Sequence, residues 1–409
     1  MPNEFLNFIL ALSIIIVAAK ASGYLSTRLG QPSVLGELLA GLILGPTVLD
    51  MLHAWPIFSE DESLGEFISI MAELGVILLM LLAGLELHLS ELVSSGKVAA
   101  LAGVLGVLFP FTLGWGTAYL FGVDSAQSIL IGLTLSATSV SISAQTLMEL
   151  NVLRSRVGLA LLGAAVFDDI LVILLLSLSS ILVGRAGGGA TGVILTIVRM
   201  VAYLVVAVVL GMWLLPRLTV WIDRLPISQG KMAFALVACL LFAWAAEVLG
   251  GVAAITGAFL VGLFLARTPF RETIESGVST LAYAFFVPIF FVNIGLEVNM
   301  RAVSGSAWWF ALAITVVAVA SKILGSGLGA QLGGFNRRQS LQLGIGMVSR
   351  GEVGLIVASF ALGEGLISPA NFSIVVFMVI IATLLTPPML RASFASRSEP
   401  GPSQQELLE

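Results

Sequence analysis

Residues 161–176 read Leu-Leu-Gly-Ala-Ala-Val-Phe-Asp-Asp-Ile-Leu-Val-Ile-Leu-Leu-Leu, an apolar run broken only by the adjacent acids Asp168 and Asp169. The run lies within an apolar stretch of about residues 155–184, longer than the roughly 20 residues that a membrane-spanning helix needs. A charged side chain at the centre of a bilayer costs about 2.5–3.5 kcal/mol on insertion scales. Two carboxylates at this depth therefore predict a functional site inside a membrane helix.

The whole chain shares this apolar character. It has 409 residues, of which 58% are hydrophobic and 11% charged, and its mean hydropathy is +1.07, whereas soluble domains carry about 25% charged residues. The apolar stretches are continuous and do not alternate, which excludes a membrane β-barrel and predicts an all-α, polytopic membrane protein. One cysteine, Cys239, rules out an internal disulfide framework, and no basic tract for nucleic acid is present.

We expect about thirteen transmembrane helices, each near the length that crosses a bilayer. Residues 1–392 then form one transporter domain, and residues 393–409, rich in Ser, Pro and Glu, form a disordered cytoplasmic tail. The expected spans are 5–27, 33–50, 64–88, 97–121, 126–149, 155–184, 191–216, 229–249, 252–268, 274–296, 304–332, 339–363 and 370–391.

The positions of lysine and arginine predict the orientation. With the N-terminus outside, the segments on the cytoplasmic side hold thirteen of these residues, whereas the outside loops hold only Arg185 and Arg301. The C-terminus is then cytoplasmic. The first apolar run has no cleavage site, so we interpret it as a retained helix. Because no targeting peptide is present, we expect a bacterial inner membrane.

The predicted helix count also indicates an internal repeat. With residues 191–216 as a linker helix, six spans precede it and six follow in inverted topology, an architecture common among secondary transporters. Spans 126–149 and 339–363 correspond, and both are interrupted by small and polar residues, at 136–141 and 344–351. Matched broken helices indicate a binding site. The alternative is that these small residues serve only helix–helix contact.

The two adjacent acids suit the binding of a cation in exchange for a proton. Neighbouring residues on a helix point about 100° apart, so one of Asp168 and Asp169 can meet a permanent partner while the other faces a cavity. Carboxylate oxygens are ligands for hard cations, and burial favours the protonated carboxyl. One carboxylate can thus hold either a proton or a sodium ion, but not both. The structural alternative is a buried pair that fixes helix packing.

Lys322 lies in the middle of the span at 304–332 and needs a carboxylate partner or must lose its proton. Asp168 and Asp169 are the candidates at the same depth. A buried lysine can itself carry an exchanged proton. The alternative is a static ion pair that braces the core.

The two interrupted spans hold further candidates. Thr138, Ser139 and Ser141 can ligate a cation, or their hydroxyls can bond back to their own helix. Arg350 and Glu352 can form a local ion pair, or can neutralise helix ends at the break.

Across about residues 5–392 the sequence resembles the monovalent cation:proton antiporter-2 family. Seven segments carry the resemblance, in the order in which they occur along the chain. They are Gly36-Glu37-Leu38-Leu39-Ala40-Gly41-Leu42-Ile43-Leu44-Gly45-Pro46, Ala72-Glu73-Leu74-Gly75, Ala83-Gly84-Leu85-Glu86, Phe167-Asp168-Asp169, Ile255-Thr256-Gly257-Ala258-Phe259, Phe286 to Glu297, and Ser349-Arg350-Gly351-Glu352.

The resemblance implies a core of helices in 97–184 and 304–391 that moves like an elevator against a panel. By the same resemblance, the panel comprises helices in 5–88 and 229–296 and is expected to form a homodimer. It also implies that Asp169 binds Na⁺, that Asp168 pairs with Lys322, and that transport is electrogenic.

We therefore expect a Na⁺/H⁺ antiporter that exchanges cytoplasmic Na⁺ or Li⁺ for external protons, without a cofactor. One alternative is a K⁺/H⁺ antiporter of the same family, although that branch typically has Gln-Asp where this chain has Asp168-Asp169. Another is a sodium-coupled symporter for an organic anion. No Walker motif or nucleotide-binding glycine fingerprint is present, so we expect neither ATP nor another nucleotide as a partner.

Overall fold

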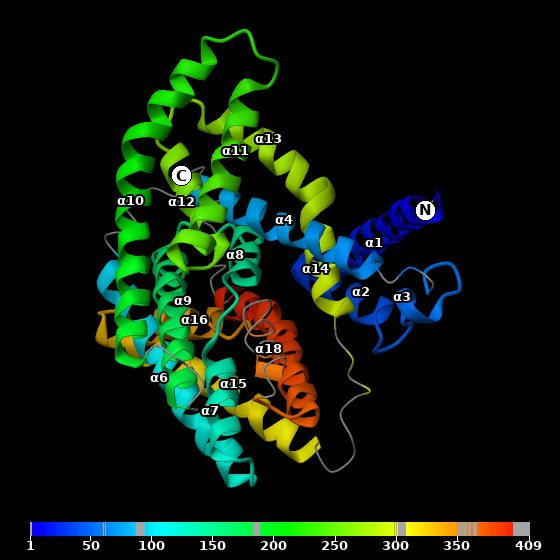
Figure 1. The fold of residues 1–409 in the computed structure, drawn as a ribbon, viewed down its shortest axis with the longest axis vertical. Helices are drawn as coiled ribbons and strands as arrows, with labels where there is room; N and C mark the ends of the chain where they lie inside the picture. Colours follow the sequence, from blue (N-terminus) through cyan, green and yellow to red (C-terminus); the bar gives the residue numbers. More distant parts are fainter. Residues whose placement is uncertain are drawn as a thin grey trace, which may run out of the picture.

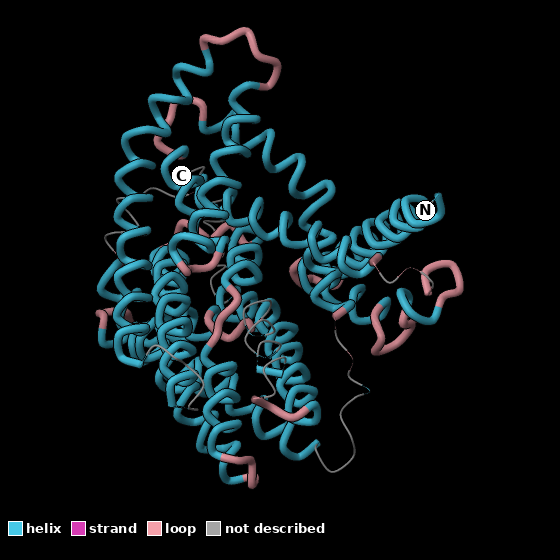
Figure 2. The backbone as a smooth tube through the Cα atoms, in the orientation of Figure 1, coloured by secondary structure: helices cyan, strands magenta, loops and turns pink. Residues whose placement is uncertain are grey.

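The computed structural model describes residues 2–395 apart from several short segments, and it contains helices and no strand in that part of the chain (Figure 2). This confirms the predicted all-α membrane fold class. Nine helical stretches of the described residues are long and apolar enough to cross a membrane. The number thirteen and the inverted repeat remain predictions. The residues not described are 1, 60, 62, 87–94, 183–188, 298, 300, 302–307, 351–353, 355–357, 359–360, 363–365 and 396–409.

One set of helices, which we call the panel group, comes from residues 2–85 and 230–296. Within it α4 packs on α12 and α14, and α2 packs on α1 and α14 (Figure 1). Its members are α1 (Pro2–Arg28), α2 (Ser33–Leu44), α3 (Met51–Ala54), α4 (Leu64–Leu85), α11 (Gly230–Ala245), η1 (Ala246–Gly250, π-helical), α12 (Ala254–Leu265), α13 (Arg271–Leu281), η2 (Ala282–Phe286, π-helical) and α14 (Val287–Leu296).

A second set, the core group, comes from residues 96–182 and 308–395. Here α6 is central and packs on α7, α9 and α15, while α15 packs on α16 and α18. Its members are α6 (Gly96–Leu120), α7 (Ser125–Ser136), α8 (Val140–Glu149), α9 (Arg156–Leu182), α15 (Trp308–Leu332), α16 (Arg337–Gly346) and α18 (Pro369–Ala395). The long helix α10 (Gly189–Asp223) links the groups and contacts α9, α11 and α12.

Three expected helix ends were clearly wrong, whereas the other described ends lie within a few residues of the expected ones. The span expected at 33–50 ends at Leu44, because Pro46 pushes Gly45 into an extended conformation (φ −75°, ψ −177°). The linker helix expected to end at 216 continues to Asp223, because the residues after Pro216 remain largely apolar. The last helix continues to Ala395, two residues past the expected start of the tail. The rest of the predicted tail lies outside the described residues.

Glycines bring helices into backbone contact within each group. In the panel group Gly84 of α4 and Gly262 of α12 meet face to face, so that a Cβ on either would collide with the other helix's backbone. In the core group Gly325 and Gly329 of α15 lie against the backbone of α6 in the same way. Small residues at such crossings allow the close packing that holds membrane helices together.

Such backbone contacts do not join the panel group to the core group among the described glycines. The nearest case is Gly30, which lies beside the flexible guanidinium of Arg391. The two groups meet instead through side chains, where α8 packs on α2 and α4, and where α18 packs on α2. Each group is thus tightly packed internally, and side chains fill the interface between them.

We expect Gly84→Leu to lower the midpoint of thermal unfolding, because overpacking a tight contact costs about 1–3 kcal/mol. Gly116→Leu is the matched control, since a Cβ at Gly116 meets no atom within 4 Å. Thermal unfolding of the purified variants in detergent, followed by size-exclusion fluorescence, tests this. Equal midpoints for the two variants would contradict the close helix contact at Gly84.

Candidate functional site

Two interrupted helices cross at the centre of the core group. The helix ends at Ser136 and resumes at Val140 in one segment, and α16 ends at Gly346 in the other, so both breaks lie where the sequence predicts them. At the crossing the Ser139 amide donates to the Ser349 carbonyl at 2.9 Å, and the Ser349 hydroxyl donates to the Ser139 carbonyl. Backbone groups freed from the helices are satisfied across the crossing, as a low-dielectric interior requires.

Arg350 neutralises the helix ends at the breaks. Its guanidinium is fully buried and donates to the carbonyls of Ala137 (3.2 Å), Met347 (3.3 Å) and Ala318 (2.9 Å). Ala137 and Met347 directly follow α7 and α16, where the partial negative charge of each helix end is concentrated. Of the two roles predicted for Arg350, these contacts match the neutralisation of helix ends. Its predicted neighbour Glu352 lies outside the described residues.

Lys322 is held by three acceptors. Its ammonium, fully buried, donates to the Gly106 carbonyl at 2.7 Å, the Ser136 carbonyl at 2.8 Å and Asp168 Oδ1 at 2.6 Å. An ammonium has three protons, so all of them are used. Lys322 thus forms a buried ion pair with Asp168 and also binds the last carbonyl of α7.

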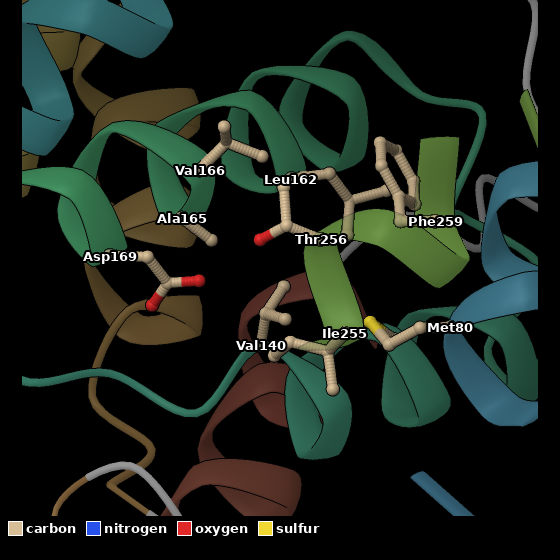
Figure 3. A pocket seen from close by; sticks show the side chains of 9 residues that line it. All are labelled: Met80, Val140, Leu162, Ala165, Val166, Asp169, Ile255, Thr256 and Phe259. Atoms are coloured by element: carbon tan, nitrogen blue, oxygen red, sulfur yellow. The ribbon is translucent and has the colours of Figure 1, made fainter. Parts of the chain in front are cut away.

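The adjacent carboxylates of α9 face different surroundings. Asp168 is fully buried against Lys322, whereas Asp169 lines a small cavity between α4, α8, α9 and α12 (Figure 3). The centre of a water-sized sphere can move within about 20 Å³ of this cavity, so the cavity holds one or two water molecules or ions of similar size. One acid thus meets a charged partner and the other faces a cavity, as the helical spacing predicts.

The residues whose hydroxyls are proposed as ligands, Thr138, Ser139 and Ser141, are not among those that line this cavity. Ser139 and Ser141 hydroxyls hydrogen bond to each other at 2.9 Å. Thr138 lies close to Asp168, yet neither Thr138 Oγ1 nor Asp168 Oδ2 has a hydrogen bond of ordinary geometry to a described residue. The structure therefore brings Thr138 to Asp168, and it places none of the three residues in the lining of the Asp169 cavity.

Two features escaped sequence reasoning. The first is Thr256 of α12, which lines the Asp169 cavity. It is the only polar side chain between residues 252 and 266 and lies in the segment Ile255–Phe259, which carries part of the resemblance; these are the signals that could have found it.

The second is a polar contact between the two helix groups. Glu149 of α8 accepts a hydrogen bond at 2.7 Å from the Ser33 amide and another from the Ser33 hydroxyl of α2. Gln145 donates to Glu149 at 3.0 Å and accepts from the Tyr283 hydroxyl at 3.2 Å. Beside them lies a cavity of about 330 Å³, lined by Leu82, Glu86, Met148, Glu272, Glu275, Ser276, Ser279 and Tyr283.

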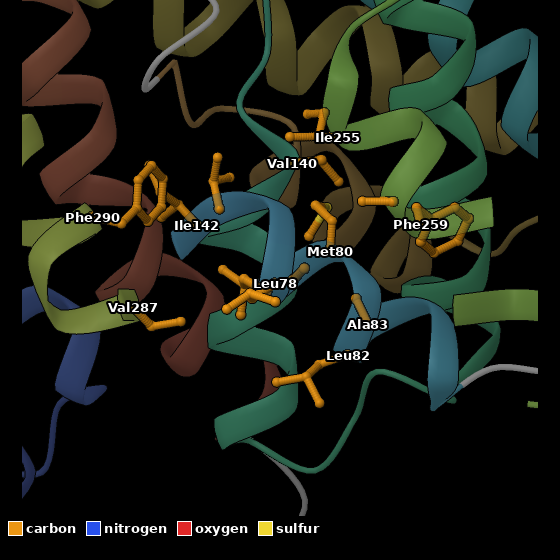
Figure 4. Packing of buried hydrophobic residues seen from close by; sticks show 14 of the residues in the cluster. Leu78, Met80, Leu82, Ala83, Val140, Ile142, Ile255, Phe259, Val287 and Phe290 are labelled. Atoms are coloured by element: carbon orange, nitrogen blue, oxygen red, sulfur yellow. The ribbon is translucent and has the colours of Figure 1, made fainter. Parts of the chain in front are cut away.

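This larger cavity is acidic and is separate from the Asp169 cavity. Burial, reinforced by the carboxylate of Glu275, raises the pKa of Glu86 above its usual value, while Arg154 and Arg271 oppose the shift. Buried apolar side chains of α4, α8, α12 and α14, including Met80 and Phe259 of the Asp169 cavity and Leu82 of the acidic cavity, pack into one cluster (Figure 4).

Crossing interrupted helices, buried charges at their crossing and a carboxylate in an internal cavity define a secondary transporter. Comparison with known proteins specifies the family. The model of the transmembrane sodium/hydrogen exchanger family matches residues 11–394, and the chain belongs to this family. It is a membrane antiporter-type transporter rather than an enzyme.

Two bacterial relatives match over almost their full lengths. The Na⁺/H⁺-K⁺ antiporter GerN of Bacillus cereus is 38% identical over 393 residues, which cover 96% of this chain and 98% of GerN. A Na⁺/H⁺ antiporter of Enterococcus hirae is 36% identical, over 94% of this chain and 98% of its own. The fold is similar to that of the sodium proton antiporter MjNhaP1 of Methanocaldococcus jannaschii at pH 8, with a TM-score of 0.69 and 18% identity over 96% and 97% of the chains.

We expect Lys322→Met to lower thermal stability strongly, because removing one member of a buried ion pair costs about 3–5 kcal/mol. The double variant Asp168→Asn with Lys322→Met removes both charges and should recover part of the loss. Unfolding midpoints in detergent measure both effects. If the single and double variants unfold at the same temperature, the unpaired Asp168 carboxylate is not the cause of the lower stability of Lys322→Met.

Proposed function

We propose that this protein exchanges cytoplasmic Na⁺ or Li⁺ for external protons, with Asp169 as the group that binds either ion. The observation that carries the proposal is the position of Asp169, whose carboxylate lines an internal cavity bounded by helices of both groups. Its neighbour Asp168 is fully buried against Lys322, whereas Asp169 faces the cavity, which is the place where an occupant can be exchanged.

Competition at one carboxylate is sufficient for exchange. Protonation removes the charge that binds a hard cation, and a bound cation displaces the proton. If the site opens to one side at a time, each passage of a cation in one direction requires protons to pass in the other. A proton gradient then drives sodium out of the cell.

The packing supports an elevator-type movement of the core group against the panel group. Close backbone contacts occur within the groups, and side chains fill the interface, which suits sliding of two rigid bodies. The contacts of Glu149 with Ser33 and of Gln145 with Tyr283 cross this interface and must break when the core group moves. They lie on the side that the arginine distribution assigns to the cytoplasm.

We propose that the ion pair makes transport electrogenic. If Lys322 releases its proton when Asp169 binds sodium, about two protons are exchanged for each sodium ion, because the lysine and the carboxylate then each contribute one. Asp168 holds the lysine in place in both states. For Glu352, which lies outside the described residues, we keep the predicted role in core electrostatics.

For the protein in its membrane, we propose an N-terminus outside and a C-terminus in the cytoplasm of a bacterial cell, in the inner membrane. Contacts support the assignment of sides, because Arg154 donates to the Glu86 carbonyl at 2.6 Å and Ser33 binds Glu149, as groups on one side would. We further propose that the panel group forms a homodimer.

Potassium is the second candidate cation. The name of GerN includes K⁺ as well as Na⁺, which keeps potassium exchange open for this chain. An organic anion is a poorer candidate, because the Asp169 cavity has about 20 Å³ of room for the centre of a water molecule and Asp169 supplies a like charge.

We expect Asp169→Asn to abolish exchange, because an amide neither releases a proton nor binds a cation through charge. Proteoliposomes carrying a pH-sensitive dye report exchange as dequenching on addition of NaCl, LiCl or KCl. Asp223→Asn is the control, since Asp223 pairs with Lys231 in an exposed position. Exchange retained in Asp169→Asn would overturn the site, and a wild-type response to KCl alone would assign potassium.

We expect Lys322→Gln to remove the voltage dependence of exchange, because the side chain can no longer carry a proton. The measurement is the exchange rate in proteoliposomes with and without an imposed membrane potential. A Lys322→Gln variant that still responds to voltage would show that the lysine is only structural.

A further inference from the structure

The Asp169 cavity has two polar side chains among its nine lining residues. They are Asp169 of α9 in the core group and Thr256 of α12 in the panel group, and both face the cavity in Figure 3. The remaining lining is apolar: Met80, Val140, Leu162, Ala165, Val166, Ile255 and Phe259. Any polar interaction of an occupant with a side chain therefore involves Asp169 or Thr256.

Thr256 is buried, with 6% of the residue exposed, and it lines the cavity. Other buried helical threonines donate to the carbonyl four residues earlier, as Thr134 does to Leu130 and Thr315 to Ala311. No described residue receives such a bond from Thr256. Thr256 is the third residue of α12, so the carbonyl four residues before it precedes the helix. The hydroxyl is therefore available to an occupant of the cavity.

A cation without most of its hydration shell needs oxygen ligands in place of water. A hydroxyl that faces the cavity can take a cation or a water as its partner. A hydroxyl offers two lone pairs to a cation and one proton to a carboxylate. Thr256 can thus ligate a cation when the site is occupied and donate to Asp169 when it is not.

We propose that Thr256 is a cation ligand opposite Asp169 and that it favours small alkali cations in this state of the transporter. The inference rests on the proposed function. Because the cavity is small, Na⁺ and Li⁺ can approach both oxygens at once, whereas the larger K⁺ gains less from the second. Because Thr256 belongs to the panel group, the complete ligand set exists only while the two groups are aligned as described here.

The test compares Thr256→Val, which keeps the shape and removes the hydroxyl, with Thr256→Ser, which keeps the hydroxyl. In proteoliposomes we expect Thr256→Val to raise the apparent KM for Na⁺ about tenfold, the effect of one lost polar contact, with little change in maximal rate. Thr256→Ser should restore the wild-type KM. The KM for K⁺, where it can be measured, should change less.

Thr315→Val is the control, because its hydroxyl is buried but bonded to its own helix. A Thr256→Val variant with the same KM for Na⁺ as this control would overturn the inference. A loss of maximal rate shared by Thr256→Val and Thr256→Ser, with KM unchanged, would also overturn it. Wild type and Asp169→Asn in the same assay test the proposed function separately, because its failure would appear there and not in the threonine variants.

Discussion

Two segments of this chain leave the helical conformation in the middle of a membrane, and much of the structure serves to satisfy the backbone groups that they expose. Hydrocarbon offers no hydrogen bonds, so freed amides and carbonyls must be paired within the protein. Ser139 and Ser349 pair with each other at the crossing. Lys322 and Arg350 bind carbonyls at the ends of α7 and α16. The breaks therefore require buried cations, and the buried cations in turn favour a carboxylate nearby.

This dependence explains why the acids of α9 come as a pair. Asp168 compensates the charge of Lys322, so it is committed to the architecture. A second carboxylate can then change its occupant without disturbing the crossing, and Asp169 lies in a cavity where that is possible. In the proposed mechanism, the structural carboxylate and the ion-binding carboxylate are separated by one residue in a helix, which turns the side chain by about 100°.

Sequence reasoning found the features that are costly in a membrane. Carboxylates, a lysine and polar interruptions within apolar stretches stand out because each carries a free-energy penalty, and this is how Asp168, Asp169, Lys322 and the breaks were located. A hydroxyl in a helix carries little penalty, since it can bond back to its own backbone.

Thr256 therefore gave almost no signal, and its place opposite Asp169 depends on how α12 packs. The contact of Glu149 with Ser33 joins residues 116 positions apart and could not be read from local pattern. The early end of α2 is signalled locally by Gly45-Pro46, but the expected span of 33–50 followed the apolar character of the stretch instead.

The distribution of glycine contacts has a consequence for how such a protein can change over generations. A side chain at Gly84 or Gly262 would collide with the backbone of the facing helix, so the interior of each helix group is tightly constrained. The interface between the groups is made of side chains whose size can vary without separating any backbone. If the two groups slide as proposed, substitutions there alter how readily they slide while leaving each group folded. Under that proposal, turnover rate and folding stability are nearly independent traits, and selection can adjust the speed of transport without endangering the fold.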